Sequence, residues 1–255
     1  MTVDEQHKAE GDSDETMIEI SSLQKSFGDN HVLNGYDLKI KKGENVVVLG
    51  KSGSGKSVLI KCIVGLLVYD SGTIRVFDSE IASQGQQELD SLRARIGFVF
   101  QSSALYDSMT VRENLEFPLR RHGREKTKSE VKELVEETLD QVGLMKAINL
   151  MPAELSGGMR KRIGLARSLV LKPEIMLYDE PTTGLDPITS MEIINLMLEI
   201  QKKYNTTSIT ISHDMRCAEL TGDRLAFLVD GKNYLQGTYD EVKKVDDPNT
   251  SPFFK

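Results

Sequence analysis

The segment from Gly50 to Ser57 has the residue types and the spacing of a loop that cradles phosphate groups. Its glycines let backbone amides approach phosphate oxygens, Lys56 is placed to reach the β- and γ-phosphates of a nucleotide, and the Ser57 hydroxyl to ligate Mg²⁺. An apolar run, Val46–Leu49, precedes the loop and a helical pattern follows it, a context that a chance glycine-rich turn usually lacks. The expected nucleotide-binding residues in and directly after the loop are Gly50, Lys51, Ser52, Gly53, Ser54, Gly55, Lys56, Ser57 and Val58.

Two adjacent carboxylates end a second apolar run, Ile175–Asp179. If this run is a parallel strand beside the phosphate loop, Asp179 is placed to hold Mg²⁺ through water. Glu180 projects differently, toward the γ-phosphate, where it can orient and deprotonate a water molecule. Alone, an apolar run that ends in Asp-Glu is weak evidence, but the phosphate loop makes it strong. We therefore expect Asp179 to be a metal ligand and Glu180 to be a general base.

A Ser-Gly-Gly turn within Leu155–Met159 begins a helix and is a second anion site. Exposed amides and a helix N-terminus attract negative charge, so the turn suits a γ-phosphate. One chain cannot bring this turn and its own phosphate loop to the same phosphate. We therefore expect Ser156, Gly157 and Gly158 to act on a nucleotide held by another copy of the chain.

This order of motifs resembles that of the ATP-binding cassette (ABC) ATPases, from Met17 to about Gly237. The resemblance implies ATP hydrolysis coupled to the closure of a homodimer. It implies that Gln101 touches Mg²⁺ and the attacking water and that His213 hydrogen-bonds the γ-phosphate. It further implies that Phe27 stacks on adenine and that Asp186 contacts the opposite protomer. The expected catalytic residues are then Glu180, His213, Gln101 and Lys56, and the expected metal ligands are Ser57, Gln101 and Asp179.

Each of the residues assigned by resemblance also has a plain structural interpretation. A lone Gln at a strand end is uninformative, and a lone His is usually structural. A Phe near a strand end, such as Phe27, is more often part of a core. Asp186 has the position of an N-cap for the helix that starts at Pro187.

The residues that flank the motifs look like those of the MlaF family, the ATPases of Mla-type lipid transporters. The Gly-Gly pair is followed by Met159 and a basic run, where many importer cassettes have Gln, and the segments 104–120 and 183–190 fit the same family. That resemblance implies phospholipid transport between envelope membranes with an MlaE-like permease, a Mce-domain lipid-binding protein and sometimes a STAS-domain subunit. Leu105, Tyr106 and Phe117 could line a groove for the permease or form the core of a helical lobe. The alternatives are another ABC transporter class, such as an amino-acid or lipoprotein system, and a non-transport cassette that acts on nucleic acid.

The resemblance and the alternating α/β pattern predict the fold class: a P-loop (RecA-like) ABC ATPase core with an antiparallel β subdomain and an inserted α-helical subdomain. We expect a disordered acidic tail at 1–15, the ATPase domain at 16–238 with the helical lobe at about 102–154, and a C-terminal tail at 239–255. Helices are expected at 56–66, 129–142, 157–171 and 187–204, and strands at 72–77, 96–100, 175–179, 207–212 and 224–230. Phe253 and Phe254 could dock on this chain, on its twin or on a partner.

The composition limits the kinds of partner and the cell compartment that we expect for this protein. The formal net charge of −7 disfavours a dedicated nucleic-acid binder, which usually carries a basic face. The longest apolar run, Val58–Val68, contains Lys61 and is too short to span a bilayer, and no signal peptide is apparent. Cys62 and Cys217 lack metal-ligand spacing and suggest a reducing compartment. We therefore expect a protein on the cytoplasmic face of the inner membrane, attached through its permease.

Overall fold

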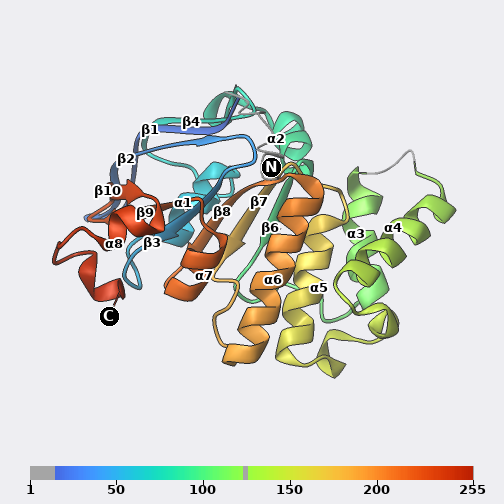
Figure 1. Cartoon of the computed structure of the whole chain (residues 1–255). Helices are drawn as coiled ribbons and strands as arrows, with labels where there is room; N and C mark the ends of the chain where they lie inside the picture. Colours follow the sequence, from blue (N-terminus) through green and yellow to red (C-terminus); the bar gives the residue numbers. More distant parts are fainter. Residues whose placement is uncertain (1–14, 123–125, 255) are drawn as a thin grey trace, which may run out of the picture.

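The computed structural model describes residues 15–122 and 126–254, which form two sheets flanked by helices (Figure 1). Residues 1–14 of the expected acidic tail lie outside the described residues. Glu15, the last residue assigned to that tail, is bonded to Lys42: its carboxylate accepts from Lys42 Nζ at 2.7 Å, and its carbonyl accepts from the Lys42 amide at 2.9 Å. No helix in the described ranges is long and apolar enough to cross a membrane.

The smaller sheet is antiparallel and has four strands in the order β2-β1-β4-β5. Its strands are β1 (Thr16–Phe27), β2 (Asn30–Lys41), β4 (Ser71–Val76) and β5 (Ser79–Glu80). Buried and exposed side chains alternate along β2, so that Leu38 and Ile40 enter the core while Lys39 and Lys41 face outward. This sheet corresponds to the expected antiparallel β subdomain.

The central sheet has six strands in the order β10-β9-β3-β8-β7-β6. They are β3 (Asn45–Leu49), β6 (Ile96–Val99), β7 (Ile175–Asp179), β8 (Thr207–Ser212), β9 (Arg224–Val229) and β10 (Lys232–Gly237). All except β10 are parallel, and every residue of β3, β7 and β8 is buried because both faces of the sheet are covered. The loops that leave β3, β6, β7 and β8 begin at the same edge of the sheet, which brings four of the motifs together.

Helices cover the two faces of the central sheet in different ways (Figure 1). They are α1 (Lys56–Ile63), α2 (Gln86–Ala94), α5 (Gly157–Leu169), α6 (Pro187–Tyr204) and α7 (Met215–Thr221), with a short 3-10 turn η1 (Ile81–Ser83) before α2. Alternate residues of β7 show the division: Ile175 and Leu177 pack into the core that contains α1 and the smaller sheet, whereas Met176 and Tyr178 pack against α5 and α6.

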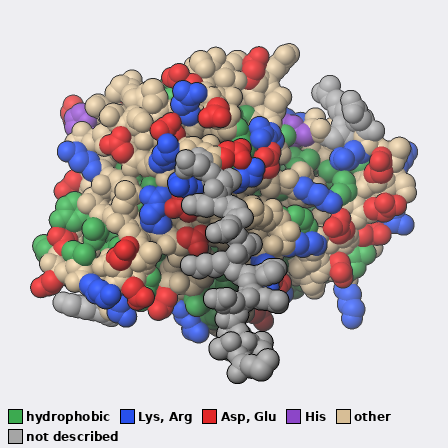
Figure 2. All heavy atoms as spheres, turned by 45° about the horizontal axis from the view of Figure 1, so that its top comes forward, with side chains coloured by type: hydrophobic (Ala, Val, Ile, Leu, Met, Phe, Trp, Pro, Cys, Tyr) green, Lys and Arg blue, Asp and Glu red, His purple; other side chains and the backbone are tan. Residues whose placement is uncertain are grey.

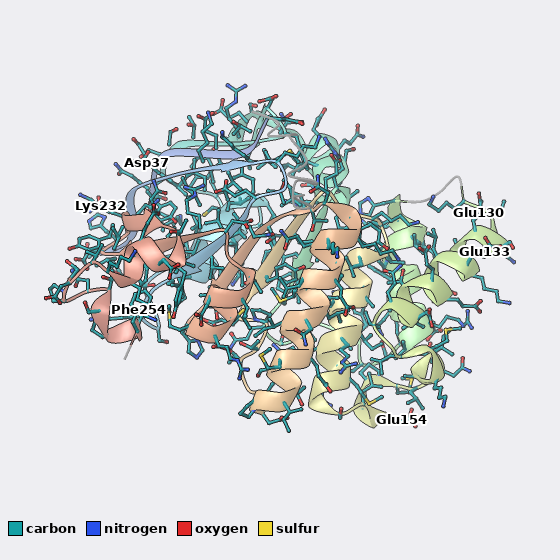
Figure 3. The ribbon with its side chains drawn as sticks, in the orientation of Figure 1. Asp37, Glu130, Glu133, Glu154, Lys232 and Phe254 are labelled. Atoms are coloured by element: carbon teal, nitrogen blue, oxygen red, sulfur yellow. The ribbon has the colours of Figure 1, made fainter. Side chains whose placement is uncertain are left out.

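A helical lobe packs beside α5, on the right in Figure 1. It contains α3 (Val111–His122), α4 (Lys128–Gln141) and the 3-10 turns η2 (Met145–Ala147) and η3 (Pro152–Glu154). On α4, Val135 and Leu139 are buried against α3 and α5, while Glu130 and Glu133 lie on the outer side of the lobe (Figure 3).

Helix α3 was not predicted. The structure places Pro118 inside the helix. A proline there removes one helix hydrogen bond. Leu115 and Leu119 on either side are fully buried, and this packing keeps the helix in place.

Asn114 of α3 is fully buried and holds the loop that enters the lobe. Its Oδ1 accepts from the Tyr106 amide at 2.8 Å, and its Nδ2 lies 3.0–3.1 Å from the carbonyl oxygens of Tyr106, Met109 and Thr110. We expect Asn114→Leu to lower the free energy of unfolding by about 2–4 kcal/mol, since buried backbone groups would lose their partner. Urea unfolding followed by circular dichroism measures this.

The control is Asn195→Leu, which makes the same chemical change at an exposed position of α6. It should change the free energy of unfolding by less than about 0.5 kcal/mol. Equal losses in the two variants would contradict the structural importance of Asn114.

The C-terminal segment folds back onto this chain. It consists of α8 (Tyr239–Lys243) and a 3-10 turn, η4 (Ser251–Phe254). The ring centroids of Phe253 and Phe254 lie 5.4 and 6.2 Å from that of Phe227 on β9, and the Phe254 centroid also lies 5.6 Å from that of Tyr239. The sequence left open whether Phe253 and Phe254 dock on this chain, on its twin or on a partner. In the structure they dock on this chain.

Candidate nucleotide-binding and catalytic site

The glycine-rich loop lies between β3 and α1 and closes around the ammonium group of Lys56. Lys56 Nζ donates hydrogen bonds to the carbonyl oxygens of Gly50 at 2.8 Å and Lys51 at 3.1 Å. Gly55 turns the loop into the helix with φ = +103°, and an added Cβ would lie 2.5 Å from Val32 Cγ1. Only glycine fits that position without displacing its neighbours.

Two oxygen groups beside the loop fit a Mg²⁺ ion. Ser57 Oγ donates to Asp179 Oδ1 at 2.8 Å. Burial raises the pKa of Asp179, and the hydrogen bond from Ser57 opposes that change. In residues 15–122 and 126–254 no group of three or more His, Cys, Asp or Glu could hold a metal by itself. Since Mg²⁺ keeps several waters and is bound through one or two carboxylates together with substrate phosphates, the remaining ligands would come from the nucleotide and from water. Gln101 as a further protein ligand stays a prediction.

Glu180 lies at the centre of the charged groups. Its Oε2 is 2.7 Å from His213 Nδ1 and accepts from Thr183 Oγ1 at 3.0 Å, while its Oε1 is 4.0 Å from Lys56 Nζ. Burial lowers the pKa of Lys56, and the negative charge of Glu180 acts against that change. The base, the histidine and the lysine that we expected at the γ-phosphate are therefore adjacent.

One cavity joins the phosphate loop to these side chains. It is lined by Phe27, Val32, Gly50, Lys51, Ser52, Gly53, Ser54, Gly55, Lys56, Ser57, Val58, Gln101, Glu180, Thr183, His213 and Phe253. Phe27 is 49% exposed, so its interpretation as a core residue is wrong. Phe27 lines the cavity, and Lys25 Nζ lies over its ring, 5.1 Å from the centroid. Stacking of Phe27 on adenine stays a prediction.

The Ser-Gly-Gly turn and Asp186 do not line this cavity. Ser156 caps α5, its Oγ accepting from the Met159 amide at 3.2 Å. Asp186 caps α6, its Oδ1 accepting from the amides of Ile188 and Thr189 at 3.0 Å. The capping interpretation of Asp186 is confirmed, and a contact with a second chain stays a prediction for both sites.

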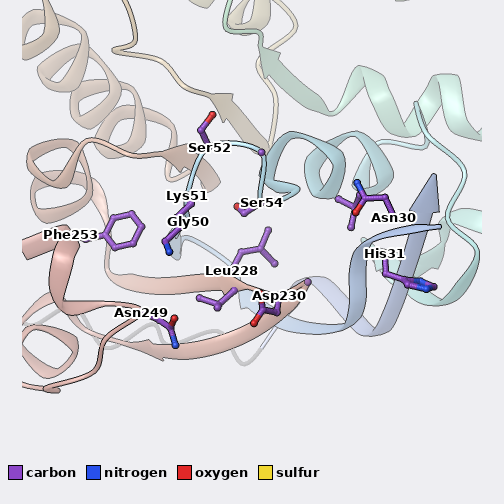
Figure 4. Close-up of a pocket in the computed structure, with 14 residues that line it drawn as sticks. Asn30, His31, Gly50, Lys51, Ser52, Ser54, Leu228, Asp230, Asn249 and Phe253 are labelled. Carbon is purple, nitrogen blue, oxygen red and sulfur yellow. The ribbon is translucent and has the colours of Figure 1, made fainter. Parts of the chain in front are cut away.

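A second hollow lies against the other side of the phosphate loop (Figure 4). It is bounded by the loop, by the β1–β2 hairpin, by the β9–β10 turn and by the C-terminal segment. Phe253 reaches the loop beside Gly50 and Lys51, and it lines both hollows. The C-terminal segment thus forms part of the wall of the nucleotide site.

Besides Val32, three residues at the site were not predicted. Thr183 and Phe253 line the cavity, and Lys161 of α5 donates to the backbone carbonyls of Gln101 and Glu180. Thr183 stands three residues after Glu180, a spacing that could have suggested a local hydrogen bond. No pattern in the sequence points to the other two, because their contacts depend on how distant segments pack.

The chain matches the ABC transporter family over residues 33–183, and it belongs to that family. It is therefore an ATP-binding protein and an ABC-type ATPase, and the predicted fold class is confirmed.

The relatives include proteins of several transport classes. Protein TRIGALACTOSYLDIACYLGLYCEROL 3, chloroplastic, of Arabidopsis thaliana is 40% identical over 261 residues, covering 96% of this chain and 74% of the plant protein. The probable ribonucleotide transport ATP-binding protein mkl of Mycobacterium leprae is 38% identical, covering 92% of this chain and 68% of its own. The glutamate transport ATP-binding protein GluA of Corynebacterium glutamicum is 39% identical, covering 84% of this chain and 88% of GluA. The MlaF subfamily is thus not confirmed and stays a prediction.

Among solved structures, the chain is similar to a dimeric structure of the ATP-binding cassette MJ0796 in a post-hydrolysis state bound to ADP and Pi. The TM-score is 0.80 at 31% identity, over 87% of this chain and 98% of that one.

Proposed function

We propose that this chain is the ATP-hydrolysing subunit of a membrane transporter, that it dimerises around ATP, and that the transported molecule is a phospholipid. The observation that carries the first part is the convergence of Lys56, Glu180 and His213 on one cavity beside the Ser57–Asp179 pair. Charged side chains gathered in this way catalyse phosphoryl transfer by positioning the attacking water and by stabilising charge on the phosphates.

The proposed chemistry divides the work among these side chains. Glu180 takes a proton from the attacking water, and His213 and Gln101 hold the γ-phosphate and that water in line. Lys56 neutralises the charge on the β- and γ-phosphates. Bound Mg²⁺, held by Ser57 and Asp179, would add further charge neutralisation at the phosphates.

The proposed homodimer supplies the second anion site. Ser156, Gly157 and Gly158 form an exposed or half-exposed turn at the N-terminus of a long helix, remote from the lining of their own cavity. A second copy could therefore place this turn on the γ-phosphate. The dimeric form of the related cassette MJ0796 supports this arrangement.

A groove between the central sheet and the helical lobe suits a permease segment. Tyr106 and Phe117 line it, with ring centroids 4.8 Å apart, and Tyr106 is 42% exposed. Leu105 packs into the lobe core instead. The groove also carries Arg93, Arg121 and Arg167, but their guanidinium groups already have partners: Asp90 in the same groove pairs with the first two at 3.3 and 2.9 Å, and the Ala104 carbonyl accepts from Arg167. An apolar helix would therefore fit the groove through the rings of Tyr106 and Phe117.

Lipid as the substrate is supported by the flanking residues that look like MlaF and by the name of the plant relative, which refers to a glycerolipid. The relatives named for glutamate transport and for methionine import are almost as similar, so amino-acid transport is the second candidate. A nucleic-acid partner has less support: acidic and basic side chains are interspersed on the face shown in Figure 2, and the net charge is −7.

Purification from the native membrane in mild detergent tests the proposal. We expect an MlaE-like permease, a Mce-domain protein and bound phospholipid to accompany the chain, which would place it on the cytoplasmic face of the inner membrane. A STAS-domain subunit would agree with this. A different permease without phospholipid would keep the ATPase and overturn the lipid substrate, and no membrane partner would overturn the transport function.

A further inference from the structure

Lys161 is a buried lysine in the first turns of α5, the helix that begins with the Ser-Gly-Gly turn. Its exposed fraction is 8%. Burial of an ammonium group is unfavourable unless hydrogen bonds replace its water shell. Burial also lowers the pKa of Lys161, whereas the carboxylates of Glu180 and Asp179 favour its charged form. A residue kept in such a place needs specific partners.

Those partners are two backbone carbonyl groups at the catalytic site. Lys161 Nζ donates to the carbonyl oxygen of Gln101 at 2.6 Å and to that of Glu180 at 3.3 Å. The first lies just after β6 and the second just after β7, so a single ammonium group joins the two loops. Hydrogen bonds from a charged donor are about twice as strong as neutral ones.

The backbone at Glu180 is one that needs support. Its φ is +51°, in the left-handed region that non-glycine residues seldom adopt. Its amide donates to the Ile211 carbonyl at 2.9 Å, and its carbonyl accepts from Lys161. The peptide groups on both sides of the Cα are therefore held, and together they set the direction in which the carboxylate points.

We propose that Lys161 is a positioning residue for ATP hydrolysis, which holds Glu180 and Gln101 at their working separation and links both to the helix that carries the Ser-Gly-Gly turn. This rests on the proposed roles of Glu180 as the base and Gln101 beside the nucleotide. Movement of α5 when its turn meets a partner's nucleotide is then transmitted to the base of the same chain.

The test replaces Lys161 by Met, which keeps the length of the side chain and removes the ammonium group. In the full chain purified from its membrane, we expect kcat to fall about 10- to 100-fold, the loss typical of small misplacements of catalytic groups. The affinity for ATP, measured without Mg²⁺ so that no hydrolysis occurs, should stay within about twofold because Lys161 does not line the cavity. Lys161→Arg, which keeps a charged donor, should restore most of the kcat.

Lys132→Met is the matched control, since the side chain of Lys132 is 64% exposed on α4 of the helical lobe and should keep the wild-type kcat. A wild-type kcat in Lys161→Met, or a loss that Lys161→Arg does not repair, would overturn the proposal. If Lys161→Met does not fold, Lys161→Gln is measured in the same way and decides by the same criteria. Glu180→Gln, assayed in parallel, separates the two ideas: normal turnover in that variant would remove the proposed base, whatever Lys161 does.

Discussion

Glu180→Gln is expected to stop ATP turnover while ATP still binds. The amide keeps the size of the side chain and can still accept from Thr183, but it cannot take a proton from water. Loss of a general base lowers kcat by about 10²- to 10⁴-fold. Phosphate release at saturating ATP measures turnover, and calorimetric titration without Mg²⁺ measures binding.

Glu199→Gln is the control for this change. Glu199 is exposed on α6 and does not line the nucleotide cavity, so its variant should keep the wild-type kcat. Wild-type turnover in Glu180→Gln would remove Glu180 as the base. Loss of ATP binding would instead show that its contact with Lys56 shapes the phosphate loop.

Gly158→Val is expected to abolish turnover at a different step, the closing of two chains around ATP. An added Cβ would lie 2.7 Å from Thr189 Cγ2, and Thr189 Oγ1 donates to Asp186 Oδ2 at 2.6 Å. The substitution would thus disturb both elements that we assign to the partner's site. We expect kcat to fall by about 100-fold or more, whereas the single chain should bind ATP as before.

Size-exclusion chromatography in the Glu180→Gln background directly measures whether two chains associate around ATP. With ATP, Glu180→Gln should elute as a dimer, and the double variant with Gly158→Val as a monomer. Ala153→Val adds similar bulk at an exposed residue close by and should leave the dimer intact. Dimer formation by the double variant would show that Gly158 is not part of the interface.

The sequence predicted that the site residues come together, because their positions depend on the order of the motifs and on the geometry of parallel strands. The strand β7 has the predicted bounds. One cavity is lined by predicted side chains from the loops after four strands, Lys56 and Ser57 after β3, Gln101 after β6, Glu180 after β7 and His213 after β8, whereas Asp186 lies outside it. Element ends were less predictable where the backbone takes special conformations. The helix expected at 56–66 ends at Ile63, before Gly65 with φ = +65°, and the strand expected at 72–77 ends at Val76, before Phe77 with φ = +51°.

The residues that hold the site in place from distant segments, Lys161 and Phe253, could not be predicted. Lys161 stands in a basic run that resembles a solvated helix face, and its burial results from the packing of α5 against the ends of β6 and β7. Phe253 reaches the phosphate loop only because the C-terminal segment folds back over β9. Contacts between segments this far apart leave no periodic pattern in the chain.

The left-handed backbone conformation of Glu180 lowers the stability of the fold, while the carboxylate at the same position is needed for the proposed activity. A side chain other than glycine in that region costs about 1–2 kcal/mol, and Asn tolerates it better than Glu does. Selection for heat resistance alone would therefore move position 180 toward Gly or Asn, and selection for turnover would return it to Glu. A thermally improved variant of this protein that has changed at this residue should be expected to be an inactive one.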